Sequence, residues 1–267
     1  MKKPEFLDRP HNPRHIPGIF NYCDRWCERC PFTARCLNYE MSEEILSKNA
    51  GSDEKQMFWE SVQESFRQTR EMIEYIAYEQ GIDLDKIEPD PEFEQKEKES
   101  KEKAEDHELS RTSMQYTKKV HKWFIAAEPV LLELEQELNN NLKLGIKTSE
   151  TQGAAIMIED AISVIRWYQH LIYTKLMRAL TSHDDLFEDM DLGDEFPSDA
   201  DGSAKVALLA IDRSIAAWGK LYEQMPTQAD EILDFLVLLE QLRRNAEKCF
   251  PKARAFIRPG FDTGHRP

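Results

Sequence analysis

The residues best suited to chemistry are four cysteines that lie close together near the start of the chain. Cys23, Cys27, Cys30 and Cys36 fall within fourteen residues, and the rest of the 267-residue sequence has one other cysteine, Cys249. A soft metal centre needs several thiolates within a few ångströms of one another. The grouping therefore predicts that this segment binds a metal ion or cluster, with these four cysteines as its ligands.

The spacing of the four cysteines, Cys-x3-Cys-x2-Cys-x5-Cys, indicates which kind of centre to expect. Structural zinc sites usually combine two Cys-x2–4-Cys pairs that a dozen or more residues separate, and no histidine lies within this segment. Four ligands on one short loop better suit a cubane cluster, whose irons are spread over several ångströms. We therefore predict a [4Fe–4S] cluster, with zinc as the alternative.

Two families have partly similar cysteine spacings. Cys23, Cys27 and Cys30 match the Cys-x3-Cys-x2-Cys motif of radical S-adenosylmethionine enzymes, which use an α/β barrel and leave one iron without a protein ligand. The last three cysteines resemble the loop Cys-x6-Cys-x2-Cys-x5-Cys of helix-hairpin-helix DNA glycosylases, in which the [4Fe–4S] cluster is structural. Both resemblances cover about fourteen residues and imply a cubane cluster here.

Residues around the cysteines suggest how such a centre would be tuned. Arg25, Arg29 and Arg35 would offset the negative charge of the thiolates and favour their formation. Trp26 and Phe32 would either shield the centre from water or pack the loop against the rest of the protein. Cys249 is far away in the sequence, and we expect it to be a buried, small hydrophobic residue.

The composition limits the range of partners. The net charge is −15, and residues 1–36 carry seven Lys and Arg against four Asp and Glu, so the remainder is strongly acidic. An acidic body disfavours binding to nucleic acid, which depends on neutralising phosphates. The sequence has neither a membrane-length apolar run nor an apolar signal segment, which predicts a cytoplasmic protein with no membrane partner. In that compartment, clustered cysteines bind metal more often than they form disulfides.

The hydrophobic pattern predicts an all-α protein, a bundle of about five long helices that follows an N-terminal metal-binding loop. Residues 1–51 would form a proline-rich arm, the cysteine loop and a short helix, and residues 52–267 the bundle. Within the bundle, residues 83–106 form a charged linker or the solvated start of a helix, and residues 183–202 an acidic loop. Pro129 predicts a kink or break. The long helices are expected at residues 52–80, 106–140, 149–180, 203–224 and 227–248.

A second group of polar residues lies in the most apolar of these helices. Glu159, Arg166 and His170 share one side of it, and Asp212 could join them if the helix is central. They would form a polar site in the bundle core, a satisfied internal ion-pair network or a half-exposed face of the helix. The sequence has no di-iron, phosphate-loop or calcium-loop motif.

Three functions follow from these features. We expect an iron–sulfur protein that transfers electrons or senses redox state and acts with a protein or redox partner. The first alternative is a helical interaction module that zinc stabilises, and the second is an enzyme that uses the polar residues of the bundle.

Overall fold

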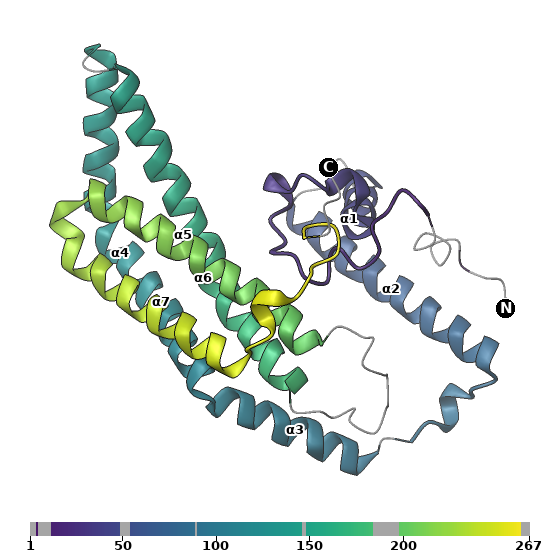
Figure 1. Cartoon of the computed structure of the whole chain (residues 1–267). Helices are drawn as coiled ribbons and strands as arrows, with labels where there is room; N and C mark the ends of the chain where they lie inside the picture. Colours follow the sequence, from purple (N-terminus) through teal and green to yellow (C-terminus); the bar gives the residue numbers. More distant parts are fainter. Residues whose placement is uncertain are drawn as a thin grey trace. The chain divides into compact units, whose positions relative to one another are not determined.

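The computed structural model shows the chain as a set of α-helices (Figure 1). Helices and short 3-10 turns make up all of the regular structure in the described residues, which contain no β-strand, so the predicted all-α class is confirmed. Most of the proline-rich arm and residues 184–197 of the predicted acidic loop lie outside the described residues. The structure describes residues 4, 12–48, 54–88, 90–145, 148–183 and 198–262.

Two of the helices in this part of the chain were not among the five long ones expected. One begins directly after Cys36, and the other occupies much of the charged segment 83–106, which had been interpreted as a linker or the start of a helix. The chain continues as one helix through Pro129, so no break occurs there. The described residues contain seven helices: α1 (Leu37–Lys48), α2 (Glu54–Gln80), α3 (Pro91–Asp106), α4 (Glu108–Lys143), α5 (Thr148–His183), α6 (Asp199–Gln224) and α7 (Ala229–Cys249).

The chain divides into two compact units. Unit 1 consists of Met1–Glu94 together with Ile257–Pro267, and unit 2 consists of Gln95–Phe256. The two ends of the chain therefore belong to the same unit, which the sequence did not indicate. No described helix is both long enough and apolar enough to cross a membrane.

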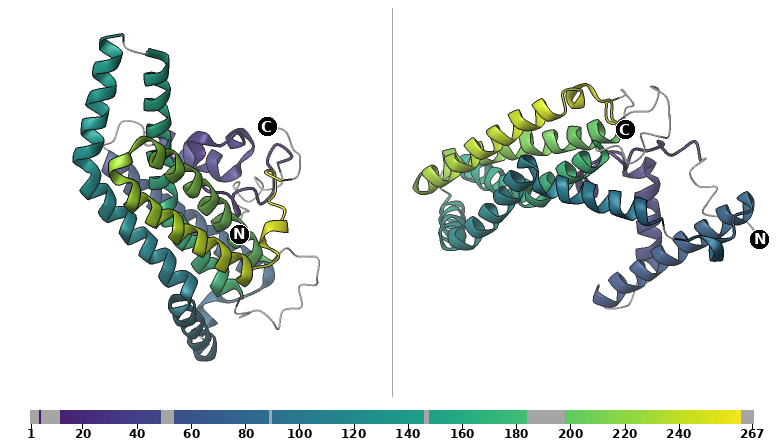
Figure 2. Two further views of the ribbon diagram at one scale, coloured as in Figure 1. Left: turned by 60° about the vertical axis from the view of Figure 1, so that its left-hand side comes forward. Right: turned by 90° about the horizontal axis from the view of Figure 1, so that it is seen from below.

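Unit 2 is built around the packing of α4, α5, α6 and α7. Helix α5 packs against α4 and α6, and α7 packs against the same two helices. Figure 2 shows α6 and α7 lying side by side. Each helix turns an apolar stripe inward, as a bundle requires. The largest fully buried side chains include Tyr116, Tyr168, Ile165, Ile172, Leu176, Leu208, Ile211, Trp218 and Ile232.

Aromatic rings from three helices form the centre of this core. The Trp218 ring stacks on Phe235, with centroids 4.4 Å apart, and meets Trp123 edge-on at 4.9 Å. The Trp218 indole N–H donates a hydrogen bond of 3.0 Å to the Tyr116 hydroxyl. Burial raises the pKa of Tyr116 to about 12, so its phenol stays neutral well into the alkaline range. The polar atoms of the cluster are thus paired inside the core.

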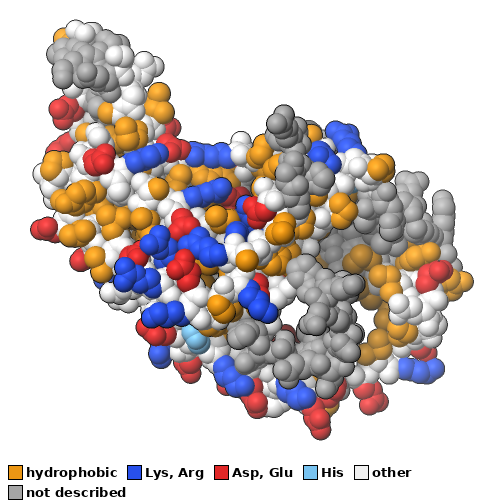
Figure 3. Space-filling view, in the orientation of Figure 1, with side chains coloured by type: hydrophobic (Ala, Val, Ile, Leu, Met, Phe, Trp, Pro, Cys, Tyr) orange, Lys and Arg blue, Asp and Glu red, His pale blue; other side chains and the backbone are white. Residues whose placement is uncertain are grey.

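In unit 1, α2 differs from the expectation. The predicted apolar face includes Phe58, Phe66 and Ile73, but these side chains are 58%, 72% and 48% exposed. Figure 3 shows hydrophobic side chains gathered on the surface of α2. The buried cluster of unit 1 lies instead around Ile16, Ile19 and Phe32, next to the cysteines.

Candidate metal centre

Two short 3-10 turns shape the segment that carries the cysteines. Cys27 begins the first turn, and the Cys30 N–H closes it by donating to the Cys27 carbonyl. The second turn covers Thr33–Arg35, and the Cys36 N–H donates to the Thr33 carbonyl. Helix α1 then begins at once, with the Glu40 N–H donating to the Cys36 carbonyl. These tight turns reverse the chain repeatedly, which brings cysteines that are distant along an extended chain near one another.

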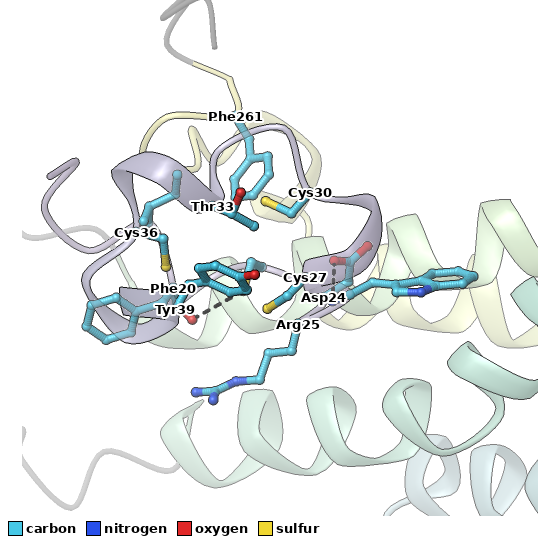
Figure 4. Close-up of a pocket in the computed structure, with 12 residues that line it drawn as sticks. Phe20, Asp24, Arg25, Cys27, Cys30, Thr33, Cys36, Tyr39 and Phe261 are labelled. Atoms are coloured by element: carbon cyan, nitrogen blue, oxygen red, sulfur yellow. Dashed lines mark hydrogen bonds between the residues drawn. The ribbon is translucent and has the colours of Figure 1, made fainter. Parts of the chain in front are cut away.

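The four cysteines line a single small pocket (Figure 4). Apolar side chains from both ends of the chain, Ile19, Phe20 and Phe261, form part of its wall. The enclosed space is about 20 Å³, which is about the room that one water molecule needs. All four cysteines are free thiols of intermediate exposure. The structure therefore gathers the four residues that the sequence singled out.

The thiols are nevertheless not arranged as the shell of a single ion. Within the described residues, no three His, Cys, Asp or Glu side chains are close enough together to hold a metal ion. Tetrahedral zinc, with Zn–S bonds of about 2.3 Å, would need sulfurs about 3.8 Å apart.

The C-terminal segment forms part of this site. The Phe261 ring contacts Phe32 edge-on at 5.2 Å, and the Arg258 guanidinium lies 4.8 Å from the Phe261 ring centroid. Arg258 also forms two hydrogen bonds of 3.0 Å with the Asp262 carboxylate. The sequence did not predict this contact, because Phe261 lies far from Cys36 along the chain and no local pattern encodes packing between residues so far apart.

Contacts across the loop hold the N-terminal side of the site. The buried His15 ring lies 3.0 Å from the Glu40 carboxylate of α1. The Ile16 N–H donates to the Arg35 carbonyl at 3.0 Å, and the Arg14 side chain donates to the Ala34 carbonyl at 3.1 Å. The segment before the cysteines is therefore tied to the second turn and to α1.

Burial, together with the neighbouring thiols, governs the electrostatics of the pocket. Burial raises the pKa of Cys27, and the charges of Cys23, Cys36 and Cys30 raise it further. Burial also raises the pKa of Cys30, although the Phe32 N–H, which donates to the Cys30 sulfur at 3.5 Å, acts in the opposite direction. The metal-free thiols at these two positions are therefore protonated at neutral pH, and ligation would have to displace their protons.

The predicted effect of the three nearby arginines on the thiolates stays a prediction. The largest causes of the Cys27 and Cys30 pKa shifts are burial and the neighbouring groups named above. The Arg29 guanidinium lies 4.0 Å from the Trp26 ring centroid, and the Arg35 side chain donates to the Arg14 carbonyl. Arg25 lines the pocket with a left-handed φ of 55°, a conformation that costs energy for a side chain of this size.

The second predicted group does not form a buried site. Glu159, Arg166 and His170 on α5 are exposed, so they form no polar site in the core, and the alternative of a half-exposed face is the one that fits. The apolar pattern of α5 set which residues share a side but not which side faces its neighbours. Arg166 lies 4.7 Å from the Phe124 ring centroid.

Asp212 takes part in a different interaction. Its carboxylate accepts two hydrogen bonds from Arg254, at 2.5 and 3.2 Å, and lies 3.6 Å from Arg243. Arg254 also pairs with Glu247, so the network joins α6, α7 and the turn that follows α7. Asp212 therefore has a structural role, away from the Glu159 stripe. Cys249 is half-buried, and burial raises its pKa, as fits an inert thiol.

Comparison with known proteins gave no relative. No protein-family model matches the chain, and no match was found among curated proteins or solved structures. The functional argument therefore rests on the residues and their geometry.

Gly260 gives a test of the C-terminal wall of the site. Its φ is +78°, and an added Cβ would lie 2.8 Å from Ile19 Cδ1 and 3.2 Å from Ile16 Cδ1. We expect Gly260→Ala to destabilise unit 1 by about 1–3 kcal/mol, measured by urea unfolding, because both the backbone and the packing are strained. Gly153→Ala is the control: a Cβ there meets nothing within 4 Å, and in the helix it should stabilise by up to about 1 kcal/mol. Equal stability of the two variants would show that Gly260 does not pack on the loop.

Proposed function

We propose that the chain binds a [4Fe–4S] cluster through Cys23, Cys27, Cys30 and Cys36, and that it transfers electrons or senses redox state. The observation that carries this proposal is that all four thiols line one pocket walled by aliphatic and aromatic side chains. Thiolates are the protein ligands that iron–sulfur clusters require, and an apolar surround is one determinant of their potential. When bound, the cluster would accept and release single electrons.

The sequence spacing of the cysteines supports a cluster over a single ion, because all four lie on one short loop. The four cysteines line one pocket. A cubane cluster is bound at four separate irons and therefore accepts more widely spaced sulfurs. The N–H of Phe32 already points at the Cys30 sulfur, and hydrogen bonds of this kind tune cluster potentials.

The placement of the cysteines fits electron transfer or redox sensing. The cysteines are partly exposed, so a bound cluster would lie near the surface, where a redox partner protein could approach. In this proposal the metal centre lies in unit 1, where residues 1–51 supply the ligands and Phe261 part of the wall, and the protein works in the cytoplasm.

The test is purification of the full chain without oxygen, followed by metal analysis and spectroscopy. We expect a brown protein with about four irons per chain, broad absorption near ~400 nm, and an electron paramagnetic resonance signal in one oxidation state. A colourless protein that holds one zinc per chain would overturn the cluster and support the zinc-stabilised interaction module. A protein that binds neither metal would refute both.

A further inference from the structure

Helix α4 carries a concentrated basic face on an otherwise acidic chain. Arg111, Lys118, Lys119 and Lys122 are all exposed, and no Asp or Glu occurs between residues 111 and 122, although the whole chain has a net charge of −15. In an α-helix, residues 111, 118 and 122 fall on the same side and span about 16 Å along the axis. We call these four cations the α4 basic face.

These four cations lack carboxylate partners in the described part of the chain. Two other surface cations of unit 2 are paired: Arg178 with Asp199 at 2.7 Å, and Lys220 with Asp160 at 3.3 Å. Four like charges on one face repel each other, and each would gain free energy from an anion placed among them. An anion bound from solution would therefore stabilise this group of cations.

The α4 basic face borders a groove rather than a flat surface. The groove has a volume of about 620 Å³, within the range typical of small-molecule sites. Its lining includes Tyr173 of α5, the thioether of Met114 and the amide of Gln115. Glu105 is the one carboxylate among the described residues that line it. The groove therefore offers several cations, an amide that can form hydrogen bonds, and an apolar wall to the same ligand.

We propose that this groove binds a small organic polyphosphate, a molecule with two or more linked phosphates on an apolar or aromatic group. The phosphates would pair with the α4 basic face, because charge-assisted hydrogen bonds from Lys and Arg are the strongest available here. The organic group would lie against Met114 and Tyr173. A basic face of about 16 Å on a strongly acidic protein is too short to offset the repulsion of a long nucleic acid. The proposal is independent of the cysteine site.

Isothermal titration calorimetry with ATP and with inorganic triphosphate, both without divalent cations, tests the proposal on the full chain. We expect saturable binding of one molecule per chain, weakened at least about tenfold in Lys118→Gln/Lys122→Gln, because each lost cation removes a charge-assisted contact. Lys248→Gln/Lys252→Gln is the matched control. It changes the net charge equally on α7 and the turn after it, and it should leave the affinity unchanged.

Three outcomes would overturn the proposal. These are the absence of saturable binding, equal weakening in both double variants, and tighter binding of a single-stranded oligonucleotide with affinity that rises with its length. Weaker binding of ATP to Tyr173→Leu, with triphosphate binding unchanged, would support the assignment of the organic group to the Tyr173 wall. Both double variants replace exposed side chains, so circular dichroism should show unchanged helix content in each.

Discussion

Replacement of Cys27 by serine should reduce the iron content of anaerobically purified protein from about four atoms per chain to less than one. Cys27 lines the pocket together with the other three cysteines, and its pKa is raised by burial and then by their charges, which places it within electrostatic reach of all of them. A serine hydroxyl is a much poorer ligand for iron than a thiolate, and a cubane cluster held by three cysteines is easily lost. Metal analysis together with absorbance near ~400 nm measures the effect.

The matched control is Cys249→Ser, which removes the fifth cysteine and leaves the other four in place. Cys249 ends α7 in unit 2 and does not line the pocket, so its loss should not change the iron content. Circular dichroism of both variants should show the same helix content as the unmodified chain, because most helices lie outside the cysteine segment. If Cys27→Ser keeps its full complement of iron, the proposed ligand set is incorrect.

The cysteine site shows what the sequence could and could not predict. Four cysteines within fourteen residues of a chain that is otherwise poor in cysteine are typical of a metal site, so the group could be recognised without a structure. The C-terminal part of the pocket wall could not be predicted. Phe261 and Gly260 lie more than 200 residues after the cysteines and carry no local signature of a role at the site. A site assembled from both ends of a chain is visible only once the fold brings the ends together.

The helices show the same division between local and long-range information. Apolar periodicity sets which residues share a face of a helix, and it located α5 and α6 within a few residues. It does not set which face is packed. The sequence left open whether Glu159 lies inside the bundle or on an exposed face, and it is exposed. The apolar side chains of α2, such as Phe66, were expected to pack but lie on the surface. Burial depends on the neighbours of a helix, and those neighbours come from distant parts of the sequence.

Replacement of Trp218 by alanine should give the largest loss of stability of any single change in unit 2. The side chain is fully buried, stacks on Phe235, contacts Trp123 and donates to the Tyr116 hydroxyl. Removal of the indole leaves a cavity among rings that cannot collapse into it, and leaves the Tyr116 hydroxyl without this donor. We expect a loss of about 3–5 kcal/mol, measured as a lower urea midpoint of the unit 2 transition.

Trp59→Ala provides the comparison, because it removes the same side chain from α2, where Trp59 is 55% exposed and meets Phe58 edge-on at 5.3 Å. Little of the Trp59 side chain is buried, so its removal should lower the free energy of unfolding by less than about 1 kcal/mol. Because the chain has two compact units, unfolding can occur in two transitions, and Trp218→Ala should shift the one that reports on α4–α7. An equal loss of unfolding free energy in Trp218→Ala and Trp59→Ala would mean that the aromatic cluster does not form the core of the bundle.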